Sequence, residues 1–168
     1  MKAIILNLSA WVILPFMDAI AKYLSSDLSF FQITWARYVF TVFFALSFIL
    51  IFCRKNLKFS ENPKLQMLRG LTLLFANICF FYSISVISMA KALTLAFIAP
   101  LVTAALSPFF LNEKVGFKRW FAILIGFIGT LVVIRPGFIE FNLATVAALG
   151  TGCLYGVYLI ITRKLHST

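Results

Sequence analysis

Apolar runs of about 20 residues constrain the fold of this chain more than any other feature of its sequence. Two of them, residues 92–111 and 120–134, are joined by the short charged segment 112–119. A helix of ~20 apolar residues is long enough to cross the hydrocarbon core of a bilayer. Of the 168 residues, 62% are hydrophobic and only 12% are charged, whereas soluble domains contain roughly 25% charged residues. The chain is therefore predicted to be an all-α integral membrane protein, because helices satisfy their own backbone hydrogen bonds in lipid.

Six transmembrane spans are predicted, over residues 3–24, 30–52, 68–87, 90–111, 120–134 and 143–162. Cytoplasmic loops carry an excess of Lys and Arg. With the N-terminus inside, the cations on the inner side are Lys2, Arg54, Lys55, Lys58, Lys64, Arg69, Lys114, Lys118, Arg119, Arg163 and Lys164. Those on the outer side are Lys22, Lys91 and Arg135. We therefore predict a polytopic transmembrane helix bundle in the cell inner membrane, with both termini in the cytoplasm (N-in/C-in).

Several other classes of protein are disfavoured. The net charge of +10 invites a nucleic-acid interpretation, but the cations lie between the apolar runs and form no stripe along a helix. The three cysteines lie in apolar runs without CxxC spacing, so no disulfide, metal site or cofactor is expected. The sequence contains neither a nucleophile–base constellation nor a Gly-rich phosphate-binding loop with a lysine. Both absences argue against an enzyme. The amino end lacks a small-residue cleavage site and is interpreted as a retained first helix.

The segment from mid-span four to the end of span five also carries a set of residues in a familiar order. They are Pro100-Leu101, Phe110-Leu111-Asn112-Glu113, Arg119-Trp120, Gly126, Gly129 and Arg135-Pro136-Gly137. In order and spacing they resemble the EamA-type half-repeat of the drug/metabolite transporter superfamily. The likeness is greatest over residues 69–137, and in outline it is similar to the branch that carries riboflavin-like or S-adenosylmethionine-like metabolites.

The resemblance implies a partial inverted-repeat transporter fold. Residues 3–137 would form one five-helix half-repeat, and residues 143–165 would be a sixth helix that opens an incomplete second repeat. The implied function is membrane transport of small organic metabolites by a secondary transporter. The alternative is a non-transporting truncated remnant, or a subunit that requires a complementary half. The expected partners are a small-molecule substrate and the lipid bilayer, with a parallel homodimer or a complementary half-transporter as possible assemblies.

Charged and polar side chains inside the spans are the candidate substrate-binding residues. An ionisable residue in a span costs on the order of 2.5 to 3.5 kcal/mol on insertion scales, so it is a functional candidate by default. Asp18 precedes the end of the first span, and Arg37 follows the start of the second, by a similar number of residues. At the helical rise both lie roughly 10 Å below the outer boundary. The candidate set is Asp18, Lys22, Trp35, Arg37, Asn77, Tyr82 and Lys91.

Two interpretations of this set remain open. In the functional one, Arg37 and the lysines bind an anionic or zwitterionic group, and Trp35 and Tyr82 stack on a flat one. Asp18 would hold the site open or bind a co-transported cation. In the structural one, Asp18 and Arg37 form an ion pair, the lysines reach toward the headgroups, and the aromatics belong to an interfacial belt.

Small residues are expected to mark close helix packing on the last three spans. Gly126 and Gly129 lie on the fifth span, and the Gly152xxxGly156 motif lies on the sixth. This surface is expected to lack a partner within the chain. Pro100 and Pro108 each remove a backbone donor and are expected to kink the fourth span.

Overall fold

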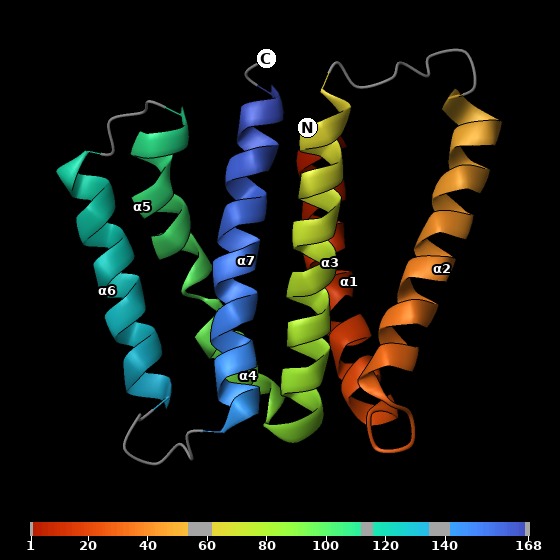
Figure 1. Cartoon of the computed structure of the whole chain (residues 1–168), viewed down its shortest axis with the longest axis horizontal. Coiled ribbons are helices and arrows are strands. Elements are labelled where there is room, and N and C mark those ends of the chain that lie inside the picture. The colour runs from red at the N-terminus through yellow and green to blue at the C-terminus, as the bar shows by residue number, and fades with distance from the viewer. Residues whose placement is uncertain (1, 54–61, 112–115, 135–141, 167–168) are drawn as a thin grey trace.

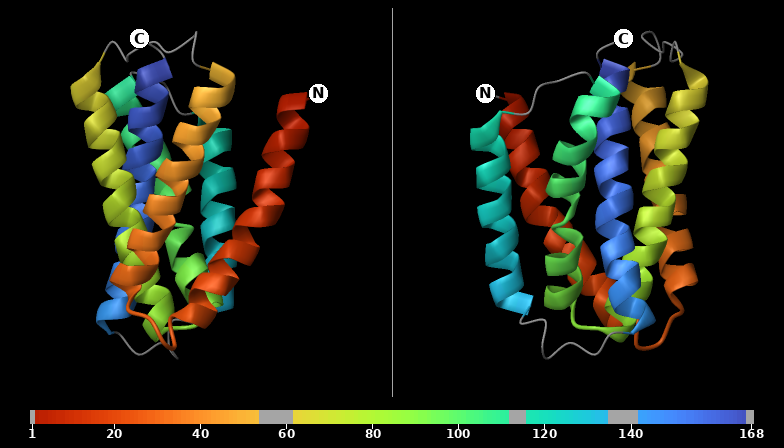
Figure 2. Two further views of the ribbon diagram at one scale, coloured as in Figure 1. Left: turned by 90° about the vertical axis from the view of Figure 1, so that its right-hand side faces the viewer. Right: turned by 60° about the vertical axis from the view of Figure 1, so that its left-hand side comes forward.

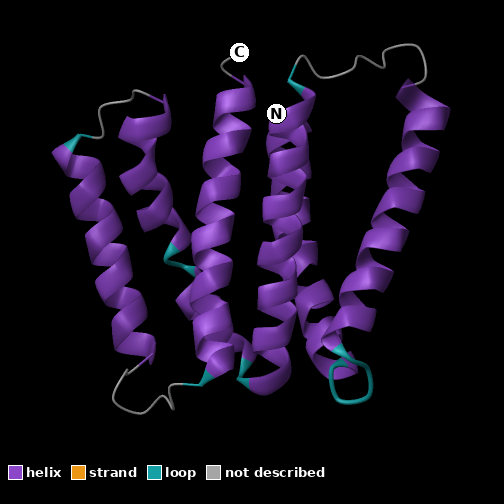
Figure 3. Ribbon diagram, in the orientation of Figure 1, coloured by secondary structure: helices purple, strands orange, loops and turns teal. Residues whose placement is uncertain are grey.

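The computed structural model describes residues 2–53, 62–111, 116–134 and 142–166, and these ranges contain helices and connections but no strand (Figure 3). The long helices are α1 (Lys2–Leu24), α2 (Phe30–Phe48), α3 (Pro63–Val86), α6 (Phe117–Ile134) and α7 (Leu143–His166). Two shorter helices, α4 (Met89–Ala96) and α5 (Ala99–Leu111), follow one another, and a π-helical turn, η1 (Ile49–Cys53), continues α2. The all-α fold class is confirmed.

Four helical segments of the described chain are long and apolar enough to cross a membrane: Phe30–Ile51, Pro63–Val86, Met89–Leu111 and Leu143–Leu165. Trp120–Gly129 is a shorter apolar stretch. The third helix begins at Pro63, five residues before the predicted start at residue 68. Proline is favoured in the first helical turn because the backbone N–H that it lacks would have no partner there. The helix therefore starts at Pro63 and includes residues 64–67, which precede the predicted span.

The centre of the bundle is α7, which lies between α3 and α5 (Figure 1). Both helices carry small buried side chains, Ala76 on α3 and Ala144 and Ala148 on α7, which are at most 2% exposed. Thr151 Oγ1 donates to the carbonyls of Ala147 (3.0 Å) and Ala76 (3.4 Å), the second of which lies on α3. Without large side chains between them, the two backbones approach closely, as in helix pairs that associate in lipid.

The fourth predicted span is broken rather than kinked. The α-helix stops at Ala96 and restarts at Ala99, with Phe97 and Ile98 between the two pieces. Pro100 follows directly, and a proline cannot donate the hydrogen bond that would continue the ladder to the carbonyl of Ala96. The break is therefore a consequence of Pro100, whereas Pro108 is accommodated inside α5.

The expectation that the Gly152xxxGly156 surface lacks a partner is wrong, because α7 packs this surface against the broken helix. A Cβ on Gly152 would lie 2.7 Å from the carbonyl oxygen of Ala96, and one on Gly156 would lie 3.0 Å from that of Ala99. Thr103 Oγ1 donates to the Ala99 carbonyl (2.8 Å) and to that of Gly156 (3.4 Å). By contrast, a Cβ on Gly126 or Gly129 of α6 would meet no atom within 4 Å.

The outer members of the bundle are α1, α2 and α6. In Figure 2 α1 diverges from its neighbours toward its N-terminal end, while its C-terminal end returns to the bundle. Its last turns join a small core with Ile33 of α2 and with Phe80, Phe81 and Ile84 of α3. The start of α1 and the end of α7 lie at the same end of the bundle (Figure 1).

Candidate functional site

The site begins where α2 enters the bundle, because its first turn is fixed by a capping box. Ser29 Oγ accepts from the backbone N–H of Gln32 (3.4 Å), and the Gln32 side chain accepts from the backbone N–H of Ser29 (2.9 Å). This reciprocal arrangement satisfies two donors that a helix start leaves unpaired. It fixes the point at which α2 begins.

One turn further along α2, Arg37 and Tyr38 share a single partner on α3. Arg37 Nη1 donates to Asn77 Oδ1 at 2.9 Å, and Asn77 Nδ2 donates to the Tyr38 hydroxyl at 3.0 Å and to the Leu73 carbonyl at 2.9 Å. The orientation of the amide is determined by chemistry, since a guanidinium has only donors and must face the amide oxygen. All three residues are partly exposed.

Two further groups shape the electrostatics around Arg37. Its guanidinium carbon lies 5.4 Å from the centre of the Phe81 ring, which is 2% exposed. This is the geometry of a cation–π contact, which is stronger where water is excluded. Asp18 is half-buried on α1 and attracts Arg37 through space. Among the described residues the hydrogen-bond partner of Arg37 is thus Asn77, and Asp18 interacts with Arg37 through space.

Lys22 has a different role. Its ammonium donates to the carbonyl of Ile84, and to that of Ile87 at 3.3 Å, both at the C-terminal end of α3. A helix end leaves its last carbonyls unpaired and carries partial negative charge, which a lysine compensates. Lys22 therefore ties α1 to α3 instead of pointing at Arg37.

The remaining candidates are not gathered around Arg37. The Trp35 side chain is 70% exposed, and Lys91 is exposed in the first turn of α4. Tyr82 packs edge-on against Phe30, with ring centres 5.3 Å apart. The structure thus brings Arg37 and Asn77 together with Asp18 nearby, and leaves Trp35 and Lys91 at the periphery.

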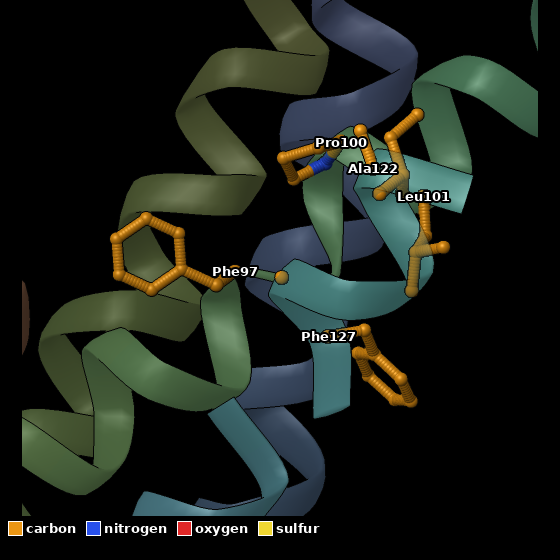
Figure 4. Close-up of a pocket in the computed structure, with 7 residues that line it drawn as sticks. Phe97, Pro100, Leu101, Ala122 and Phe127 are labelled. Atoms are coloured by element: carbon orange, nitrogen blue, oxygen red, sulfur yellow. The ribbon is translucent and has the colours of Figure 1, made fainter. Parts of the chain in front are cut away.

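A separate pocket of about 390 Å³ lies beside the break between α4 and α5 (Figure 4). Phe97, Pro100 and Leu101 line one side, and residues of α6, among them Ala122 and Phe127, line the other. Every lining residue is apolar, and none belongs to the candidate set. The pocket is therefore unsuited to a charged group.

Sequence reasoning missed Tyr38 and Phe81, which contact the candidates directly. Tyr38 follows Arg37 in the chain, and Phe81 lies one turn after Asn77 on α3. Residues three or four apart on a helix share a face, so the spacing of Asn77 and Phe81 was a usable signal. For Tyr38 the sequence offers no such signal, because adjacent residues on a helix point about 100° apart.

The comparisons with known proteins decide the family. The model of the EamA-like transporter family matches residues 1–135. The chain belongs to this family. It is thus a multi-pass membrane protein of a transporter family rather than an enzyme family. No solved structure gives a significant match to this EamA-like chain.

Several curated relatives are similar to this EamA-like chain. An S-adenosylmethionine uptake transporter of Rickettsia bellii is 33% identical over 125 residues, which are 74% of this chain and 43% of the relative. That of Rickettsia prowazekii is 29% identical over 164 residues, 95% of this chain and 55% of the relative. A riboflavin transporter of Vibrio cholerae is 35% identical over 77 residues, 46% of this chain and 26% of the relative. The chain thus spans about half the length of the first two relatives.

Proposed function

We propose that the chain takes part in membrane transport of small organic metabolites, as a secondary transporter or the membrane-embedded part of one. S-adenosylmethionine is the first substrate to test, because uptake transporters of that compound are among the relatives. The observation that carries the proposal is the contact of Arg37 with Asn77 between two helices that are each apolar and long enough to span a membrane. A guanidinium within a span is costly to insert, so Arg37 is a functional candidate by default.

Arg37 is the principal substrate-binding residue in this proposal, with Asn77 beside it and Asp18 as the opposing charge. Trp35, Tyr82 and Lys91 are assigned secondary roles, because they lie outside the contacts made by Arg37. Lys22 is assigned to holding α1 on α3, since its ammonium is already bonded to two carbonyls.

The proposed topology is six spans with both termini in the cytoplasm, in a cell inner membrane. It is supported by the excess of Lys and Arg on one side and by the start of α1 and the end of α7 lying at the same end of the bundle (Figure 1). Single cysteines at Ser26 and Ser60 test it with a reagent that does not cross the membrane; Ser60 lies outside the described residues. We expect labelling at Ser26 alone, and labelling at Ser60 alone would reverse the orientation.

Flux into vesicles tests the function itself. Purified chain in sealed vesicles should give saturable uptake of S-adenosylmethionine, and Arg37→Ala should abolish it while leaving insertion and helix content unchanged. The matched control is Arg163→Ala, at an exposed position near the end of α7, which should keep the flux. Wild-type flux in Arg37→Ala would refute the assignment of Arg37.

The second candidate function is that of a component that works only with a complementary half, or of a remnant without transport. The chain covers 43% and 55% of the length of two relatives. In this version residues 3–137 form one half-repeat, and residues 143–165 open a second.

The assembly would be a parallel homodimer or a complex with a separate half. An antiparallel pair is disfavoured, because one chain inserts in both directions only when Lys and Arg are nearly balanced on the two sides. Vesicles that contain this chain alone separate the two functions, since robust saturable flux would remove the need for a second component.

A further inference from the structure

Two side chains bonded to Asn77 keep hydrogen-bond donors without an acceptor among the described residues. Asn77 Nδ2 can only donate, so the Tyr38 oxygen is the acceptor of their 3.0 Å hydrogen bond. The hydroxyl proton of Tyr38 then remains available. Among the described residues Tyr38 has no other hydrogen bond.

Arg37 is in the same position. A guanidinium has five N–H donors, and the contact with Asn77 Oδ1 uses one of its nitrogens. Its carbon also lies 5.4 Å from the centre of the Phe81 ring, and no hydrogen bond to another described residue uses the remaining N–H groups. Arg37 and Tyr38 are consecutive on α2 and are held by the same amide, so their unused donors are fixed relative to each other.

We propose that Arg37 and Tyr38, oriented by Asn77, form a binding site for a carboxylate group of the substrate. The proposal rests on the transport function above. It adds Tyr38 as a ligand-binding residue and gives Asn77 the role of a positioning residue. A carboxylate fits because it is acceptor-only and because charge-assisted hydrogen bonds to an arginine edge are the strong ones.

The charge balance favours a singly charged carboxylate over a phosphate dianion. Asp18 on α1 interacts electrostatically with Arg37, so an ionised Asp18 offsets part of the positive charge of Arg37. One negative charge on the ligand is then paired by Arg37, and a cationic group on the same ligand has Asp18 as its counter-charge. A dianion would leave uncompensated charge in a poorly solvated region, which is costly.

Paired ligands test the site directly. The probes are S-adenosylmethionine and its decarboxylated analogue, S-adenosyl-3-methylthiopropylamine, which differ only by the carboxylate. Binding of each radiolabelled compound is measured by equilibrium dialysis against the full chain in lipid nanodiscs. We expect the wild-type chain to bind the carboxylate-bearing compound at least roughly tenfold more tightly, because hydrogen bonds to charged groups are the stronger class.

Tyr38→Phe removes only the hydroxyl and leaves Asn77 bonded to Arg37 and Leu73. It should weaken binding of S-adenosylmethionine by roughly 10-fold to 100-fold and leave binding of the analogue unchanged. The matched control is Tyr23→Phe, at a side chain that is 79% exposed on α1, which should change neither.

Each outcome of these binding measurements decides a stated claim. Equal affinity of the wild-type chain for the two probes would overturn the carboxylate site and leave the transport proposal standing. Equal weakening of both probes by Tyr38→Phe would assign the hydroxyl to packing and overturn its role in binding. Failure of the wild-type chain to bind either probe would overturn S-adenosylmethionine as substrate together with the site. If Tyr38→Phe does not fold, the comparison of the two probes on the wild-type chain still decides the ligand class.

Discussion

Gly152→Ala should destabilise the bundle, although alanine is the better helix former. The added Cβ would lie 2.4 Å from Ile98 Cγ2 and 2.7 Å from the carbonyl oxygen of Ala96. The Ile98 side chain can rotate, but the carbonyl belongs to the backbone of the break and would have to retreat by about 0.7 Å to reach ordinary contact at 3.4 Å. Overpacking of this kind costs typically ~1–3 kcal/mol.

Gly150→Ala is the matched control, because it lies two residues earlier on the same helix and a Cβ there meets no atom within 4 Å. Both substitutions gain the same helix propensity of about 1 kcal/mol, so this gain cancels in the comparison. The free energy of unfolding of Gly152→Ala should therefore lie ~1–3 kcal/mol below that of Gly150→Ala.

The assay is unfolding by sodium dodecyl sulfate in bicelles, followed by circular dichroism, with the wild-type chain alongside. Gly150→Ala should unfold at the same or a higher detergent fraction than the wild-type chain, and Gly152→Ala at a lower one. Coincident curves for the two variants would show that α7 does not press against the break, and would refute the packing described here. Gly156→Ala gives a second check, since its Cβ would lie 2.8 Å from two side-chain carbons of Val102.

Two further predictions concern polar side chains of the bundle. Ser83→Ala should leave stability unchanged or raise it by up to ~1 kcal/mol in the same unfolding assay, because the Ser83 hydroxyl is buried among described residues without a hydrogen-bond partner. A loss of stability would reveal a partner for that hydroxyl. Lys22→Met should lower the free energy of unfolding by ~1 kcal/mol, since it removes the hydrogen bonds to the end of α3. The control Lys91→Met, at an exposed side chain, should leave the free energy of unfolding unchanged. Intact stability with lost flux in Lys22→Met would instead place Lys22 in the substrate site.

The helices could be predicted from the sequence because the physical requirement is simple: about 20 apolar residues cross a bilayer. The candidate site was harder, since counting residues from a span end gives depth but not direction. Trp35 and Arg37 lie at nearly the same depth. Because they are two positions apart on a helix, however, their side chains point about 200° apart around the helix axis. Arg37 accordingly contacts Asn77 on α3, and Trp35 is 70% exposed.

The break at Phe97–Ile98 shows a second limit. Pro100 indicates that a hydrogen bond is missing, and a helix can respond by bending or by stopping. Which of these occurs depends on what lies beside it. Here Gly152 of α7, about 50 residues later in the chain, leaves room for the carbonyl of Ala96. No local pattern around Pro100 contains that information.

The central place of α7 has a consequence for the order in which the bundle is assembled during synthesis. This helix is the last one described, yet α3 and α5 pack mainly against it rather than against each other. When those two helices leave the ribosome, the surface that each will finally bury has no partner. The small-residue faces around Ala76 and Ala99 therefore have no packing partner, in lipid or beside the insertion machinery, until the 24 residues of α7 have been synthesised and inserted.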